Sequence, residues 1–367
     1  MMKFIWNVIL PVVILSCVFF AVNYKRTSGQ SKSTEIYNLK QDDKTLKGAY
    51  KDYFPIGAAV RPETDFKDSK TTTFIKEQFS SLTGKQAMQP AWIHPKEYEY
   101  RWAKADSLVD FAQKNNLLVR GHCLIWYLKM PAWFLKDGNK PASKEVVLER
   151  MRKHIFTVMG RYKGKVYSWD VVNEAERPTD KLFALLGEEY IEKAFEFAHE
   201  ADPQAKLYYN DGVYNTKQRE KFYELIKRLK VKGVPIDGMG IQYHLGIEGK
   251  SKEDIQQDID AFKSLGLDVQ ISELDVSTFN RNATIKSVLH TNDKYSKDLE
   301  DRQARIYGDI FEILRKNHDV VKGVTFWGID DGIGKTFLEK KLNKRNYPYI
   351  FGAGLKPKEA FFTIINF

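Results

Sequence analysis

Cysteine is nearly absent from this chain of 367 residues, which contains only Cys17 and Cys123. Because Cys17 falls in an apolar N-terminal stretch, the rest of the chain has one thiol and can form no internal disulfide. We expect Cys123 to be a free, buried thiol. The His and Cys spacings of zinc sites and the signatures of iron–sulfur clusters and P-loops are also missing. We therefore expect no metal site and no cofactor.

Motifs for nucleic-acid binding are missing too, although the net charge is +10, from 58 Lys and Arg against 48 Asp and Glu. A basic surplus can reflect nucleic acid, a membrane surface or an anionic substrate. The sequence contains no RNP-like motif, no zinc-finger spacing and no helix dense in lysine and arginine, so we expect no nucleic-acid partner. The 19 Tyr, 23 Phe and 7 Trp fit a carbohydrate-binding cleft, and they fit a large core equally well.

A long apolar run occurs at the N-terminus, where residues 4–22 are almost wholly apolar and basic residues flank both sides. We interpret residues 1–23 as a signal peptide or an uncleaved membrane anchor. The protein is then exported: membrane-anchored, periplasmic, on the cell surface or secreted. The stretch ending at Cys17 loosely resembles a lipoprotein cleavage site, but apolar residues follow the cysteine where a polar tether is usual. Residues 24–47 are polar without a sustained apolar period, which predicts a linker.

Residues 48–367 alternate short β-type runs with longer segments whose apolar residues recur every 3.6 positions. Eight such alternations predict a parallel sheet closed into a barrel, an α/β fold of the (β/α)8 TIM-barrel type in a single catalytic domain, which we expect to be monomeric. An open Rossmann-type sheet is the rival, but no glycine-rich phosphate turn follows the first run. The expected strands are residues 54–60, 79–82, 117–121, 166–172, 206–209, 238–241, 267–271 and 321–326.

Polar side chains follow most of these runs. In a barrel, the carboxyl ends of the strands converge on one face, where active sites lie. Cleaving a glycosidic bond requires two carboxyl groups, one protonated and one ionised. Glu174 and Glu273 follow two of the runs, three strands apart. Either glutamate alone is more often a surface or capping residue, but the two at matching positions favour catalysis. The residues that end the runs are His122, Asn173-Glu174, Asn210-Asp211, Gln242 with His244, Glu273 with Asp275, and Trp327.

Eight motifs resemble those of glycoside hydrolase family 10, which contains the retaining endo-β-1,4-xylanases. The similarity runs in order from about Phe54 to Phe367 and identifies the chain as a divergent member. The motifs are Arg120-Gly121-His122 with Trp126, Trp169-Asp170-Val171-Val172-Asn173-Glu174, Tyr208-Tyr209-Asn210-Asp211, Gly240-Ile241-Gln242-Tyr243-His244, Glu273-Leu274-Asp275, Phe326-Trp327-Gly328, Asn346-Tyr347-Pro348 and Lys356-Pro357-Lys358.

This resemblance implies a role for each residue of the site. Glu174 is expected to be the general acid/base and Glu273 the nucleophile, in a (β/α)8 barrel with carboxyl groups about 5–5.5 Å apart. Asn173 is expected to bind the sugar 2-hydroxyl. His244, with Asp275 behind it, is expected to orient Glu273 and keep it ionised. Of the remaining residues, Gln242 is expected near Glu174, and His122, Trp126 and Trp327 in the subsite where the sugar is distorted.

The chain departs from the family pattern at positions that hold the sugar next to the cleavage point. Gln86 and Gln89 stand where the family has Asn and Lys, and Lys129 stands where it has Gln. Lys335 replaces a Trp and begins a loop, residues 335–345, with five basic residues and one acidic residue. These changes suggest an anionic glycan bearing uronate or sulfate. A solvated basic loop on an ordinary xylanase is the simpler interpretation.

The sequence therefore leaves open which polysaccharide is the substrate and how the protein acts on it. The first hypothesis is a retaining endo-β-glycanase acting on xylan. Residues 277–299 are long enough to block the cleft and make the enzyme exo-acting. A surface protein that only binds glycan is the alternative from another class, although it would need no such set of catalytic residues. Of the other carboxylates in the Glu174 segment, we expect Asp170 to make structural hydrogen bonds and Glu176 to form an ion pair in a loop.

Overall fold

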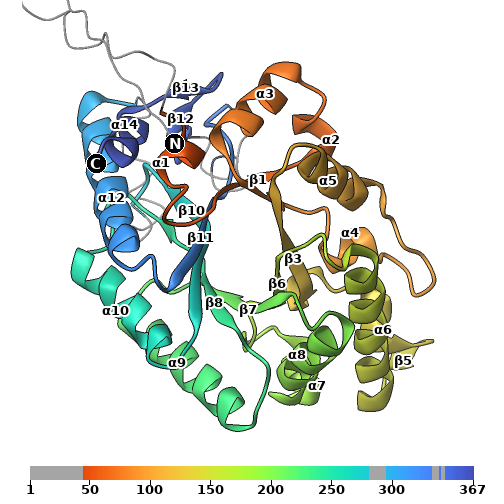
Figure 1. Cartoon of the computed structure of the whole chain (residues 1–367). Coiled ribbons are helices and arrows are strands. Elements are labelled where there is room, and N and C mark those ends of the chain that lie inside the picture. Colours follow the sequence, from red (N-terminus) through yellow and green to blue (C-terminus); the bar gives the residue numbers. More distant parts are fainter. Residues whose placement is uncertain (1–43, 281–294, 333–338, 340–343) are drawn as a thin grey trace, which may run out of the picture. The chain divides into compact units, whose positions relative to one another are not determined.

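A computed structural model describes residues 44–280, 295–332, 339 and 344–367. Eight parallel strands close into a barrel with helices around it, which confirms the (β/α)8 fold (Figure 1). Successive strands pair side by side, and pairing of the last two, β10 and β11, together with β1 and β11, completes the ring. The strands are β1 (Ile56–Val60), β2 (Ser81–Gly84), β3 (Leu118–Trp126), β6 (Ser168–Asn173), β7 (Lys206–Asp211), β8 (Gly238–Ile241), β10 (Asp268–Val276) and β11 (Val321–Phe326).

Most of the long helices begin at a polar N-cap and bury one apolar face. In α6, the side chain of Ser143 accepts a hydrogen bond from the first turn, and residues spaced three or four apart, such as Val147 and Met151, are fully buried. The helices are α1 (Leu46–Ala49), α2 (Pro62–Asp65), α3 (Ser69–Gln78), α4 (Pro90–Ile93), α5 (Ala103–Lys114), α6 (Lys144–Tyr162), α7 (Lys181–Leu186), α8 (Glu189–Ala201), α9 (Thr216–Val231), α10 (Lys252–Lys263), α12 (Lys297–Lys316) and α14 (Glu359–Ile365).

Short elements decorate the carboxyl end of the barrel. Two 3₁₀ turns, η1 (Tyr127–Lys129) and η2 (Ala132–Leu135), follow β3. The two-residue strand β9 (His244–Leu245) pairs in parallel with the end of β10, with His244 opposite Asp275. Two small hairpins complete the list: β4 (Lys136–Asp137) with β5 (Lys140–Pro141), and β12 (Phe351–Gly352) with β13 (Lys356–Pro357).

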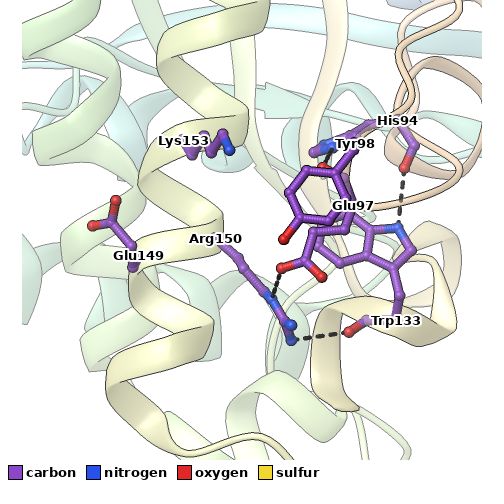
Figure 2. A pocket seen from close by; sticks show the side chains of 7 residues that line it. All are labelled: His94, Glu97, Tyr98, Trp133, Glu149, Arg150 and Lys153. Atoms are coloured by element: carbon purple, nitrogen blue, oxygen red, sulfur yellow. Dashed lines mark hydrogen bonds and ion pairs between the residues drawn. The ribbon is translucent and has the colours of Figure 1, made fainter. Parts of the chain in front are cut away.

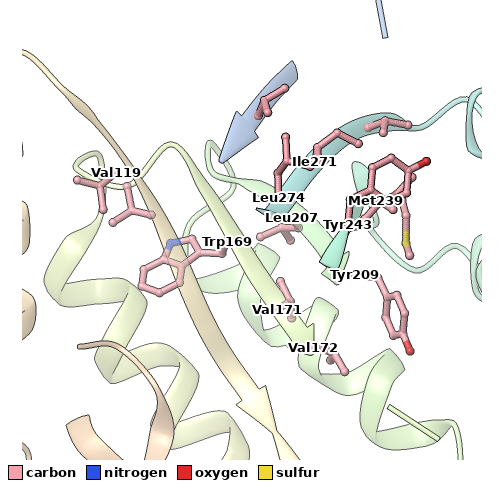
Figure 3. Packing of buried hydrophobic residues seen from close by; sticks show 14 of the residues in the cluster. Val119, Trp169, Val171, Val172, Leu207, Tyr209, Met239, Tyr243, Ile271 and Leu274 are labelled. Carbon is pink, nitrogen blue, oxygen red and sulfur yellow. The ribbon is translucent and has the colours of Figure 1, made fainter. Parts of the chain in front are cut away.

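Apolar residues of the strands pack against the helices and against one another (Figure 3). Trp169 on β6 is fully buried beside Gly121 on β3. A Cβ atom at position 121 would lie 2.1 Å from the Trp169 indole, so only glycine fits there. This close approach holds together the two strands that carry His122 and Glu174.

Several boundaries differ from the sequence predictions. β3 continues past residue 121 to Trp126, and β10 continues past residue 271 to Val276, because their polar side chains lie inside the barrel mouth rather than in loops. The folded body begins before residue 48, since Leu46 in α1 is fully buried in the core. Residues 1–23 and most of the expected linker lie outside the described residues. No helix among residues 44–280, 295–332 and 344–367 is long and apolar enough to cross a membrane.

Candidate active site

Glu174 follows the last residue of β6 in a left-handed backbone conformation, with φ of 54°. A residue other than glycine pays roughly 1–2 kcal/mol for this conformation, and such outliers gather at functional sites. Its backbone N–H donates to the carbonyl oxygen of Asn210 at 2.9 Å, on the neighbouring strand β7. The turn therefore directs Glu174 out of the strand and into the barrel mouth.

Glu273 on β10 is only 5% exposed, and both of its carboxylate oxygens accept hydrogen bonds. One oxygen lies 3.0 Å from Nε2 of His244 and the other 3.0 Å from Nδ2 of Asn210. Burial by itself would raise the pKa of Glu273, but the hydrogen bond from His244 and the charges around it lower that pKa overall. Glu273 is therefore ionised at neutral pH.

His244 bridges two carboxylates. Its Nδ1 lies 2.7 Å from Asp275, and its Nε2 contacts Glu273. Burial opposes the charged form, but the two carboxylates outweigh it and raise the pKa of His244 to about 9. Both ring nitrogens then donate, so the imidazolium fixes the orientation of the Glu273 carboxylate.

The pKa of Glu174 is shifted in the opposite direction from that of Glu273. Burial, and after it the negative charge of Glu273, raises the pKa of Glu174, while a hydrogen bond from Gln242 counteracts part of the effect. Two neighbouring carboxyl groups whose pKa values are pushed apart provide an acid and a base in one site. The geometry thus suits Glu174 to donate a proton and Glu273 to act as the anion.

The amide side chains of Asn173, Asn210 and Gln242 form a hydrogen-bonded group next to the two glutamates. Oδ1 of Asn173 accepts hydrogen bonds from Asn210 at 2.8 Å and from Gln242 at 3.0 Å. The amide nitrogen of Asn173 is buried and has no hydrogen-bond partner among the described residues. Since buried donors normally find a partner, this N–H group is suited to a ligand hydroxyl beside Glu174.

Aromatic rings form the neighbouring part of the mouth. The ring centroid of His122 lies 5.2 Å from that of Trp327 and 6.0 Å from that of Trp126. Nδ1 of His122 contacts Asp170 at 2.9 Å, and Asp170 also receives two hydrogen bonds from Arg120. Nε2 of His122 and Nε1 of Trp126 are buried without a partner in the described part of the chain. Together they leave two polar ring atoms without a partner beside flat rings, which suits a hydroxyl-rich sugar.

Comparison with known proteins gives the family. The model of glycosyl hydrolase family 10 matches residues 45–367. This chain belongs to glycosyl hydrolase family 10. It is 40% identical to a β-1,4-xylanase of Dictyoglomus thermophilum, covering 97% of each chain. It is 38% identical to endo-1,4-β-xylanase B of Paenibacillus barcinonensis, covering 88% of this chain and 98% of the relative.

Solved structures agree with this assignment to family 10. A crystal structure of an endo-1,4-β-xylanase from Caldicellulosiruptor owensensis superposes with a TM-score of 0.81 at 38% identity, covering 88% of this chain and all (100%) of the other. Xylanase XynB of Paenibacillus barcinonensis, solved with a conduramine derivative, gives a TM-score of 0.80 at 36% identity, covering 89% and 99%. Both likenesses extend over the whole barrel.

The four residues that depart from the family 10 pattern differ in burial and in contacts, and one of them lies outside the described residues. Gln86 is half-buried, and Gln89 is 3% exposed, with its Nε2 donating to the carbonyl of Lys85 at 2.7 Å. The ammonium of Lys129 lies 5.6 Å from the ring centroid of Trp126. Lys335 and residues 281–294, which include most of the loop expected to block the cleft, lie outside the described residues.

The two other carboxylates of the Glu174 segment, Asp170 and Glu176, contact neighbouring side chains of the protein. Asp170 is fully buried and holds Arg120 and His122, which confirms a structural role. Glu176 does form an ion pair, but its partner is Lys221 of α9, at 3.1 Å. The neighbouring Arg177 pairs with Asp211 instead, because its side chain turns toward the end of β7.

Three contributors to the mouth are absent from the site predicted by sequence. Asn210 contacts both Asn173 and Glu273, and its position at a strand end was the available signal. Arg120 lies in the same motif as His122 and holds Asp170 from inside the barrel. Lys85 directly precedes the predicted residue Gln86. Within the described residues, no three His, Cys, Asp or Glu side chains are grouped so that they could hold a metal ion.

A second pocket, of about 180 Å³, lies between α6, η2 and the segment after α4 (Figure 2). His94 lines it and contacts His154 of α6 behind it, Nδ1 to Nδ1, at 3.1 Å. The other ring nitrogens lie 3.1 Å from the carbonyl oxygens of Glu97 and Leu124. None of the mouth residues lines this pocket, so it belongs to the scaffold.

This histidine pair predicts a loss of stability in acid. Burial lowers the pKa of His94, and it lowers the pKa of His154 to about 3. Below about pH 6.5 the unfolded chain takes up protons that the folded chain does not, so the free energy of unfolding falls by about 1.4 kcal/mol per pH unit for each such group. Urea unfolding at about pH 7 and pH 5 measures this. In His154→Gln the fall with pH is expected to be smaller by up to about 2 kcal/mol; equal falls in both proteins would contradict the assignment.

Proposed function

We propose that this chain is a retaining endo-β-1,4-xylanase that acts through Glu174 and Glu273. The observation that carries the proposal is the pair itself: a half-buried glutamate with a raised pKa directly after β6, and an ionised glutamate on β10 held by His244. Membership of family 10 and the xylanases among its relatives support the same reaction.

In the first step, Glu174 gives its proton to the glycosidic oxygen while Glu273 attacks the anomeric carbon. The bond to the leaving sugar breaks, and a bond between the anomeric carbon and the Glu273 carboxylate forms. Asn173 donates its free N–H to the sugar 2-hydroxyl, an interaction that strengthens in the transition state. His244 keeps Glu273 ionised until it attacks, since its two hydrogen bonds fix both the charge and the orientation.

In the second step, water attacks the anomeric carbon, and Glu174, now a carboxylate, takes up the proton of that water. Glu273 leaves as a carboxylate, and the sugar keeps its β configuration after two inversions. The loss of the Glu273 charge in the intermediate lowers the pKa of Glu174, because that charge is one cause of the raised value. The same residue can therefore act as acid first and as base second.

The residues around the glutamates would bind the sugar chain. His122, Trp126 and Trp327 would pack against the sugar next to the cleaved bond, since their rings surround the mouth beside Asn173. The remaining contacts are proposed for Gln86, Gln89, Lys129 and Lys335, of which Lys335 lies outside the described residues.

Product analysis tests this function. Wild-type protein incubated with a linear β-1,4-linked xylohexaose is expected to release oligosaccharides of several lengths, and proton NMR at early times is expected to show the β anomer before mutarotation. An α anomer at early times would exclude the double displacement. Release of single sugars from one chain end would favour the exo-acting alternative, and binding without turnover would favour a glycan-binding protein. The xylanase relatives do not favour either alternative.

We also propose export through residues 1–23 and a monomeric protein. The apolar run 4–22 with its flanking basic residues supports export, and a soluble polysaccharide-degrading enzyme outside the cell has direct access to its polymeric substrate. Whether that segment is cleaved or anchors the protein to a membrane follows from the mass of the mature chain.

A further inference from the structure

Three positively charged side chains follow three adjacent strands of the barrel. Arg61 comes directly after β1, Lys85 directly after β2, and Lys129 lies in η1 directly after β3. β1, β2 and β3 are neighbours in the sheet, and the three residues follow their carboxyl ends, so they share one side of the barrel mouth. The backbone N–H of Lys85 donates to the carbonyl of Val60 at 2.9 Å, which brings Lys85 next to Arg61.

The rings of Trp126, His122 and Trp327 form a row in the mouth, which we call the aromatic row. Two of the three charged side chains lie at its opposite ends. The ammonium of Lys85 lies 5.9 Å from the ring centroid of Trp327 and 5.9 Å from that of Tyr349. At the other end, Lys129 lies 5.6 Å from Trp126. His122 connects Trp327 and Trp126. A sugar chain lying on these rings would therefore pass between the charged groups.

Lys85 is half-buried and, in the described part of the chain, lacks the carboxylate partner that two more deeply buried lysine side chains have. Lys250 contacts Asp258 at 2.6 Å, and Lys358 contacts Asp331 at 3.0 Å. Among the described residues, no hydrogen bond or ion pair reaches the ammonium group of Lys85 or Lys129 or the guanidinium group of Arg61. An enclosed cation without a counter-ion destabilises the folded protein, so such a group needs a reason to be kept.

The electrostatic environment leaves Lys85 charged at neutral pH. Burial, and then repulsion from Arg61, lowers the pKa of Lys85 to about 8, while Asp275, Asp65 and Glu273 act in the opposite direction. Its charge is therefore present below about pH 8 and is lost above it. A bound anion would raise this pKa and would be held most strongly where the ammonium is protonated.

We propose that Lys85, with Arg61 beside it, forms a carboxylate-binding subsite, that Lys129 adds positive charge at the other end of the aromatic row, and that the enzyme prefers xylan chains that carry a uronic acid branch. The inference rests on the proposed function and specifies its substrate. Ammonium and guanidinium groups bind carboxylates by charge-assisted hydrogen bonds, and the row of Trp126, His122 and Trp327 supports the uncharged sugar rings. The main chain of the substrate is still xylan, and the carboxylate of the branch acts as the counter-ion of Lys85.

The test compares two substrates that differ only in charge. One is a xylo-oligosaccharide with a single glucuronic acid branch, and the other is the same molecule after reduction of the carboxyl group to an alcohol. We expect wild type to show a kcat/KM for the acidic substrate about tenfold above that for the reduced one at low salt. The ratio should fall toward one at high salt and above about pH 8, as the charges are screened or lost.

Lys85→Met is expected to lower this ratio several-fold, whereas Lys114→Met should leave it unchanged. Lys114 ends α5, is exposed, and provides the same change in net charge away from the mouth. Lys129→Met repeats the test at the other end of the aromatic row, and decides the matter if Lys85→Met does not fold.

The outcomes separate this inference from the function on which it rests. A ratio near one in wild type, or the same ratio in wild type, Lys85→Met and Lys129→Met, would overturn the carboxylate subsite and leave the xylanase intact. Failure of wild type to cleave either substrate would instead contradict the proposed function. The reduced substrate therefore serves as the measure of basal activity.

Discussion

Replacing Glu273 by alanine is expected to lower kcat on xylo-oligosaccharides by on the order of 10⁴-fold or more, because it removes the atom that forms the covalent bond. The residue is 5% exposed and receives hydrogen bonds from His244 and Asn210. Those donors remain in the variant, so binding of substrate should be nearly retained and the loss should appear in kcat rather than KM. Steady-state kinetics on xylohexaose measure the effect.

A small external nucleophile distinguishes loss of the nucleophile from general damage. Azide added to Glu273→Ala with an aryl β-xylobioside should enter the space left by the carboxylate and attack the anomeric carbon from the same face. The product is then a glycosyl azide of inverted, α configuration. Glu200→Ala, at an exposed position of α8, is the matched control and should keep wild-type activity. Turnover by Glu273→Ala close to that of wild type would contradict the mechanism.

Replacing Glu174 by alanine is expected to lower kcat/KM on xylohexaose by roughly 10²–10⁴-fold, the usual contribution of a general acid. Burial and the charge of Glu273 raise the pKa of Glu174, which favours its protonated form, and only a poor leaving group needs that proton. An aryl xylobioside with an acidic phenol leaves without assistance. Its first step should therefore be little affected, and a burst of phenol should precede slow turnover, because Glu174 is also the base of the second step.

The configuration of the azide product again tests the assignment. In Glu174→Ala, azide replaces the water of the second step and attacks the intermediate on Glu273, so the expected product is a β-azide. Asn173 and Gln242 keep their hydrogen bond in this variant, which preserves the support of the site. Equal losses on xylohexaose and on the aryl substrate would show that Glu174 does not protonate the leaving group.

Much of the barrel follows from local sequence. All eight strands were predicted at nearly the observed places, because each parallel strand is an apolar run and each helix has its own apolar period. The predicted ends of the strands were less accurate than their positions. Polar residues normally mark the end of a strand, but β3 contains His122 and Trp126, and β10 contains Glu273 and Asp275. Because the side chains that face the barrel mouth are polar, a prediction from composition places the ends of these two strands too early.

Partners of charged residues were harder to predict than their positions. Sequence proximity suggests that Glu176 pairs with Arg177, but Glu176 contacts Lys221 and Arg177 contacts Asp211. Likewise, no local pattern indicates that Lys85 lies beside Trp327 and Tyr349, which are more than 200 positions away. Such contacts depend on which strands become neighbours when the barrel closes.

The sequence by itself determined that this chain is an eight-stranded barrel of family 10 with Glu174 and Glu273 at strand ends, since motif spacing and apolar period are local properties. Only the tertiary structure decided that Glu174 has a raised pKa, that Glu273 has a lowered one, and that the half-buried Lys85 lies beside Trp327 and Tyr349. Protonation depends on burial and on charges a few ångströms away in space. Those distances exist only once β1, β2 and β3 lie beside one another and face the carboxylates of β6 and β10.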